Sequence, residues 1–139
     1  MGVDAEIRGA LARGGDGDWR ELWAAVDEVA GLTIYADWER PAGQVPFPVY
    51  VPAVDRVRRQ LGVLGLYVPF AWPDWEGVVR YRDDPAALAD APVTDAVRLL
   101  TAIQRSERFS DGSIEGALES GVMPAALARL RRWYDHERP

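Results

Sequence analysis

The stretch that decides the fold runs from Arg98 to Trp133 and reads RLLTAIQRSERFSDGSIEGALESGVMPAALARLRRW. It contains three helical runs, which are separated by the breaks SDG (110–112) and SG (120–121). Apolar residues recur along each run at the spacing of a helix that buries one face. The pattern predicts three consecutive helices near Pro92–Arg108, Ser113–Ser120 and Pro124–Tyr134.

The residues upstream predict three more helices and two strands. Capping residues and apolar stripes place the helices near Asp18–Ala30, Pro52–Leu64 and Pro73–Tyr81. Runs rich in β-branched and aromatic residues predict strands at Leu32–Trp38 and Val45–Val51. The short apolar run at Leu66–Phe70 could form a third strand.

Together these elements predict the α+β class, as a mostly helical single domain of about six helices with a small antiparallel β-sheet or hairpin. Gly9 and the motif GGDG (14–17) interrupt the helical spacing at the N-terminus. We therefore expect residues 1–17 to form a weakly ordered segment and residues 18–139 to form one globular domain. Its core should contain Trp23, Val57, Leu61, Leu100, Ile103, Leu127 and Leu130.

Two prolines shape the second predicted strand. Pro46 and Pro48 lie two residues apart in VPFPVYV (45–51), so their missing N–H groups fall on one edge, which cannot pair. The N–H groups of Phe47, Val49 and Val51 remain free to pair on the other edge. We expect an edge strand that is protected against further pairing, with these last three side chains on the core face.

Composition excludes several kinds of chemistry. The 139 residues carry a net charge of −6, with 22 carboxylates against 16 cationic residues, all of them arginine. Without lysine there is no Schiff-base amine, and without cysteine there is no disulfide, thiol nucleophile or Cys-type zinc site. The single histidine, His136, lies close to the C-terminal end, which argues against a histidine triad or metal cluster. We therefore expect no metal and no cofactor.

The charge and the hydropathy pattern also limit the partners. A net negative chain repels phosphate backbones, so we expect no nucleic-acid binding. No run approaches membrane-spanning length, and the N-terminus lacks the apolar core of a signal peptide. We expect a soluble cytoplasmic protein that does not bind membranes.

Two regions are candidate ligand-binding sites. The first is an aromatic and proline-rich region, which could line a groove or simply pack a loop over the sheet; its residues are Tyr50, Tyr67, Phe70, Trp72, Asp74, Trp75 and Glu76. The second is the helix junction, where Arg108 could bind an anion or tie one helix end to a carboxylate such as Glu119. The other residues of this junction are Arg105, Phe109, Asp111, Gly112 and Glu115.

Two other groups of charged residues have simpler explanations. The carboxylate pairs Asp74 with Glu76 and Asp83 with Asp84 lie at predicted helix starts, where carboxylates suit the helix dipole. The arginine groups lie beside carboxylates and fit solvated helix faces better than a nucleic-acid surface; they are Arg56, Arg58, Arg59, Arg129, Arg131 and Arg132.

Four sequence segments are distinctive when they are taken together. They read VYVPAVDRV (49–57), LGLYVPFAW (64–72), DPAALADA (84–91) and LLTAIQRSERFSDGSIEGALESG (99–121). In these segments and in the order of its elements, the chain resembles a small bacterial family of uncharacterised proteins, the domain-of-unknown-function family DUF6508. The resemblance implies a fold and no mechanism.

The residues leave three functions open. We expect a non-catalytic soluble domain that binds another protein or a small molecule, because no catalytic residue set can be identified. The first alternative is a small enzyme, a hydrolase or lyase, that uses carboxylate and arginine side chains. The second is an accessory protein of a phage or mobile-element system.

Overall fold

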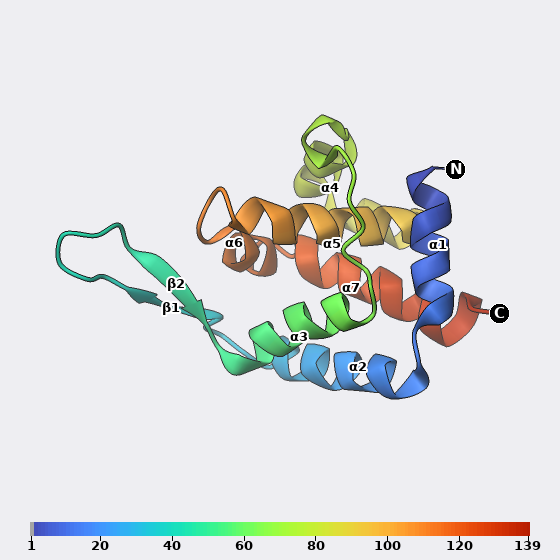
Figure 1. Ribbon diagram of the computed structural model, residues 1–139, viewed down its shortest axis with the longest axis horizontal. Helices are drawn as coiled ribbons and strands as arrows, with labels where there is room; N and C mark the ends of the chain where they lie inside the picture. The colour runs from blue at the N-terminus through green and yellow to red at the C-terminus, as the bar shows by residue number, and fades with distance from the viewer. Residues whose placement is uncertain (1) are drawn as a thin grey trace.

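A computed structural model describes residues 2–139 and shows a bundle of helices with one projecting hairpin (Figure 1). The α-helices and strands are α1 (Val3–Arg13), α2 (Asp16–Ala30), β1 (Ala36–Glu39), β2 (Phe47–Tyr50), α3 (Pro52–Val63), α4 (Gly77–Asp83), α5 (Val93–Glu107), α6 (Ser113–Glu119) and α7 (Val122–Arg132). Short turns of other helix types lie at Trp72–Asp74, Pro85–Asp90 and Trp133–Glu137. This confirms the α+β class, and α2–α7 correspond to the six predicted helices.

Helix α1 differs from the expected weakly ordered segment. Ile7, Ala10 and Leu11 are buried in the core, and α1 packs against α5. Asp4 also forms an ion pair with Arg98 of α5, at 2.5 Å. Contacts with a helix about ninety residues away stabilise α1, so its weak local pattern did not reveal it.

Helix α5 lies at the centre of the molecule and contacts α1, α4, α6 and α7 (Figure 1). The seven residues predicted for the core are all buried, and the helices share one hydrophobic cluster. The molecule is therefore a single compact domain.

Leu66–Phe70 is not a strand. It runs as extended chain beside α5, where buried Thr101 replaces the missing partner strand. The Thr101 hydroxyl has two carbonyl acceptors within reach, Leu66 at 3.1 Å and Val97 at 3.0 Å, and it accepts from the Val68 N–H at 3.3 Å. One side chain thus pairs the backbone groups that a neighbouring strand would otherwise have to pair.

The helix predicted at Pro73–Tyr81 is divided into a turn at Trp72–Asp74 and helix α4. Trp75 is in extended conformation between them, and its ring lies over Gly77, where an added Cβ would come within 2.2 Å of it. Tyr81 is buried, whereas Val79 is half exposed. Local packing of Trp75 therefore moves the start of the helix past the position that the sequence favoured.

The two strands form an antiparallel hairpin in which Ala36 faces Tyr50 and Glu39 faces Phe47. The Val51 N–H donates to the Tyr35 carbonyl at 3.0 Å, so that edge of β2 faces β1 as predicted. The predicted core face is wrong for Phe47 and Val49, which are exposed while Tyr50 is buried; Val51, which follows β2, packs partly buried against the core. Both faces of β2 carry apolar residues, so alternation could not decide which one turns inward.

The hairpin projects from one end of the molecule, while α1 and the C-terminal turn lie at the opposite end (Figure 1). At that opposite end, Trp19 packs against Trp23, Trp133 and Tyr134 with ring centroids 5.3–5.7 Å apart. Among residues 2–139 we find no helix with the length and apolar character needed to cross a membrane.

Candidate functional site

The end of α5 is tied to α6 by the carboxylate of Glu107. Its oxygens accept hydrogen bonds from the N–H groups of Gly112 and Ile114, both at 2.8 Å. They also accept from the Tyr50 hydroxyl at 2.7 Å, and this hydroxyl in turn accepts from the Glu115 N–H at 3.1 Å. One carboxylate therefore joins α5, the start of α6 and strand β2.

A second contact fixes the other strand of the hairpin. The Trp38 indole N–H donates to the Glu115 carboxylate at 3.0 Å. Its ring packs on Gly112, which has φ +92°, and an added Cβ there would lie 2.9 Å from the ring. The hairpin is thus fastened to the α5–α6 corner, the segment from Glu107 to Glu115, through both strands.

Arg108 does not have the structural role expected for it at this corner. Its side chain is exposed and makes no hydrogen bond or ion pair with any of residues 2–139. Glu107, the preceding residue, makes the contacts that hold the corner. Neither Ser110 nor Asp111 caps α6 with its side chain, since the Glu107 carboxylate already accepts from the first N–H groups.

Beside the corner is a depression of about 290 Å³, here called the arginine depression; its lining residues are Arg58, Gln104, Arg105, Glu107 and Arg108. Arg58 of α3 donates to Gln104 at 3.1 Å and to Asp55 at 3.2 Å, and its guanidinium lies 5.2 Å from the centre of the Tyr50 ring. Arg105 has no hydrogen bond or ion pair within residues 2–139. Two guanidinium groups therefore remain available to a ligand.

The two tyrosines of this region keep their protons at neutral pH. Burial raises the pKa of the Tyr50 hydroxyl, and its hydrogen bond to Glu107 raises it further. Burial also raises the pKa of Tyr67, against the opposing effect of the positive charges of Arg58 and Arg105. Both hydroxyls act as hydrogen-bond donors, Tyr67 to the Arg58 carbonyl at 2.9 Å.

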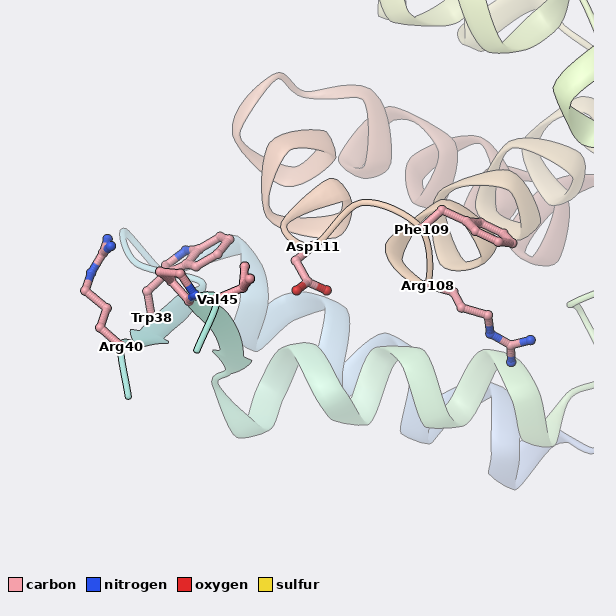
Figure 2. A pocket seen from close by; sticks show the side chains of 7 residues that line it. Trp38, Arg40, Val45, Arg108, Phe109 and Asp111 are labelled. Carbon is pink, nitrogen blue, oxygen red and sulfur yellow. The ribbon is translucent and has the colours of Figure 1, made fainter. Parts of the chain in front are cut away.

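A second hollow of about 660 Å³, here called the hairpin depression, lies between the hairpin and the corner; it is lined by Trp38, Arg40, Val45, Pro46, Arg108, Phe109 and Asp111. Figure 2 shows Asp111 between the hairpin residues and Arg108, whose side chain points away from the hairpin. Val45 is 80% exposed and Phe109 is 78% exposed. Arg108 lines both depressions and joins them into one surface.

The structure brings together only part of the predicted site residues. Arg105, Arg108 and Asp111 line this surface, and buried Tyr50 lies beneath it, bonded to Glu107. Trp72 instead lines a third groove, of about 470 Å³, together with Leu99 and other residues of α5 and α6. The helical spacing turns Arg105 about 120° and Arg108 about 180° away from Leu99 around the helix axis, so the two regions lie on different faces.

The remaining aromatic candidates fit structural packing. Trp75 packs against Phe70 at 5.9 Å and Tyr81 at 6.1 Å between ring centroids. Asp74 is exposed and has no hydrogen-bond partner within the described chain. The first predicted groove therefore does not form as one site.

Several other charged groups form ion pairs away from this surface. Arg131 pairs with Asp27 at 2.7 Å, and Arg129 and Arg132 both pair with Glu137. Within residues 2–139, no three carboxylate or histidine side chains gather as metal ligands would.

Sequence reasoning missed Glu107, Trp38, Arg40, Val45 and Arg58 as parts of this surface. Glu107 lies at the end of α5, six residues before α6 begins at Ser113, so it does not occupy the position of a capping residue in the sequence. The other four residues belong to the hairpin or to α3. No local signal connects them to α5, because only the tertiary packing brings them there.

We compared the chain with known proteins. No curated protein and no solved structure matches it. The model of a family of unknown function, DUF6508, matches residues 16–136. This range contains both depressions and leaves α1 outside. The match covers most of the chain and confirms the family resemblance seen in its segments, so the chain belongs to DUF6508, a family of unknown function.

Proposed function

We propose that this chain is a non-catalytic binding domain whose ligand carries negative charge and binds in the arginine depression. The observation that supports this most directly is the pair of unpartnered guanidinium groups, Arg105 and Arg108, next to Arg58. Guanidinium groups bind carboxylates and phosphates through two parallel hydrogen bonds. Free arginine donors in a hollow are what an anionic ligand needs.

The surrounding charge favours an anion over a cation. Four arginines line the two depressions, against the carboxylates Glu107 and Asp111. Glu107 already accepts three hydrogen bonds, so little of its capacity remains for a cationic ligand. The site is therefore locally positive on a chain whose net charge is −6.

Three carboxylates outside the two depressions are held in their charged form, so none of them suits the role of a general acid. Hydrogen bonds from arginines lower the pKa of Asp16, Asp27 and Glu137. A general acid needs the opposite shift to hold a proton at neutral pH. These three carboxylates serve surface ion pairs instead.

The test is a titration with inorganic phosphate and with citrate, followed through the side-chain Nε–Hε signals of the arginines in NMR spectra. We expect saturable shifts of the Arg105 and Arg108 signals. The double variant Arg105→Gln/Arg108→Gln should abolish this binding.

The matched control is Arg20→Gln/Arg59→Gln, which removes the same charge from exposed arginines outside both depressions. It should leave the affinity within about twofold, which corresponds to roughly 0.4 kcal/mol. Equal loss of binding in the two double variants would mean that the anions respond only to net charge, and the proposal would be wrong.

A further inference from the structure

We propose that the natural ligand is an acidic segment of a partner protein that also carries an apolar side chain. This inference rests on the proposed function and specifies its ligand. The acidic groups would bind Arg105 and Arg108, and the apolar side chain would pack on Phe109 and Val45.

The first argument is the adjacency of charge and apolar surface. Arg108 lines both depressions, and Phe109 follows it directly in the chain. Phe109 and Val45 are the two most exposed large apolar side chains of the described residues, and both line the hairpin depression. Exposed aromatic side chains beside arginine are typical of the residues that dominate protein interfaces.

The second argument is how open this surface is. Five of the seven residues that line the hairpin depression are exposed, namely Arg40, Val45, Arg108, Phe109 and Asp111. A pocket for a small molecule encloses most of its ligand. An open surface that continues from the hairpin to α3 suits an extended peptide that lies across it.

The third argument is charge complementarity. Arg40, Arg105 and Arg108 have no ion-pair partner among residues 2–139, so an incoming acidic segment displaces no internal partner from them. Nucleic acid would require a longer track of cations.

The fourth argument is that the two halves of the surface are held in place before any ligand binds. Glu107 fixes Tyr50 of β2 to the corner, and Trp38 of β1 packs on Gly112. A surface that is already ordered loses little conformational entropy on binding. Pro46, which lines the hairpin depression, has no N–H to donate, so recognition here depends on side chains more than on strand addition.

The experiment compares three seven-residue peptides by fluorescence anisotropy with the whole chain. The first alternates Asp and Glu around a central Phe, the second has Ala in place of that Phe, and the third has Asn and Gln in place of the acids. We expect the first to bind at least tenfold more tightly than either of the others.

Variants of the protein locate the contact. Phe109→Ala should weaken binding of the Phe peptide about tenfold, or roughly 1.4 kcal/mol, and leave phosphate binding unchanged. Val79→Ala, which shortens a half-exposed apolar side chain on α4 outside both depressions, should change neither. Arg105→Gln/Arg108→Gln should remove binding of both peptide and phosphate.

The outcomes separate this inference from the proposed function. If phosphate binds through Arg105 and Arg108 but the Phe and Ala peptides bind equally, the inference is wrong and the proposed function stands. If no anion binds through these arginines, both are wrong. Arginine-dependent binding to a mixed-sequence duplex that is tighter than binding to the acidic peptide would mean that the ligand is nucleic acid. An arginine-dependent dimer in sedimentation would mean that the ligand is a second copy of this chain.

Discussion

At the scale of single residues, Glu107 makes the largest number of contacts at the corner. Its carboxylate accepts from two backbone N–H groups and from Tyr50, and it is only partly exposed. Arg108, one position later, makes no such contact among residues 2–139. Two adjacent charged residues therefore have different roles: the Glu107 carboxylate stabilises the corner, and the Arg108 guanidinium remains available to a ligand.

Replacing Glu107 with Gln should lower the free energy of unfolding by about 1.5–3 kcal/mol, because one charge-assisted acceptor becomes an N–H donor facing the donors of α6. Urea denaturation followed by circular dichroism measures the change. Glu119→Gln, at an exposed position of α6, is the control and should change stability by no more than about 0.5 kcal/mol. Equal effects would show that Glu107 does not hold the corner.

Tyr81 should make the protein less stable in alkali. Its buried hydroxyl donates to Asp95 at 2.6 Å, and burial followed by this hydrogen bond raises its pKa from 10.0 to about 12. Because the folded state holds the proton more tightly, this stabilisation is present below the unfolded pKa and is lost as pH rises through the folded value. Urea denaturation at increasing pH should show this loss, and Tyr81→Phe should reduce it.

At the scale of elements, the hairpin shows that tertiary contacts determine which face of β2 is buried. The sequence pattern placed Phe47 and Val49 on the core face, although Pro48 and Tyr50 make the other face of β2 apolar as well. The Tyr50 hydroxyl bond to Glu107 and its buried ring show which side faces inward. The prolines could be placed correctly from sequence because a missing N–H is a local property.

The contact between hairpin and corner can be tested with two glycines of similar conformation. Gly112 has φ +92° and Gly121 has φ +88°, so alanine at either position should cost roughly 1–2 kcal/mol in backbone strain. Gly112→Ala should cost more, because its Cβ would also displace Trp38, whereas Gly121 has open space. Denaturation and the Trp38 indole NMR signal measure this difference; identical losses and an unshifted signal would contradict it.

Helix α1 should be part of the cooperative core although it lies outside the family match. Ile7 is fully buried, so Ile7→Ala should lower the free energy of unfolding by about 2–5 kcal/mol. Val3→Ala, at a partly buried position, should cost less. Thermal denaturation gives the comparison, and an unchanged midpoint for Ile7→Ala would show that α1 packs only loosely.

The elements that sequence predicts well are those with strong local signals. Helices α2, α3, α5 and α7 have long apolar stripes, and Gly65, with φ +74°, follows the C-cap residue of α3. Helix α1 has only a few apolar residues and an internal Gly9, and its burial depends on α5. The start of α4 depends on where the Trp75 ring packs, which no local pattern contains.

At the scale of the whole molecule, α5 separates two surfaces of different character. One face borders the groove with Trp72 and Leu99, and a different face carries Arg105 and Arg108. Sequence could place the two arginines beside Asp111 because they share one short segment. The sequence could not show that Arg58 and the hairpin residues also belong to the site, because their position depends on how α3 and the hairpin pack against α5.

The position of the hairpin has a practical consequence for a biosensor. Helix α1 and the C-terminal turn lie at the end of the molecule opposite the hairpin (Figure 1). A biotinylated linker attached near either end would therefore anchor the protein to a chip with both depressions directed into the flowing solution. Immobilisation through these ends would present every molecule to an injected peptide in nearly the same accessible orientation.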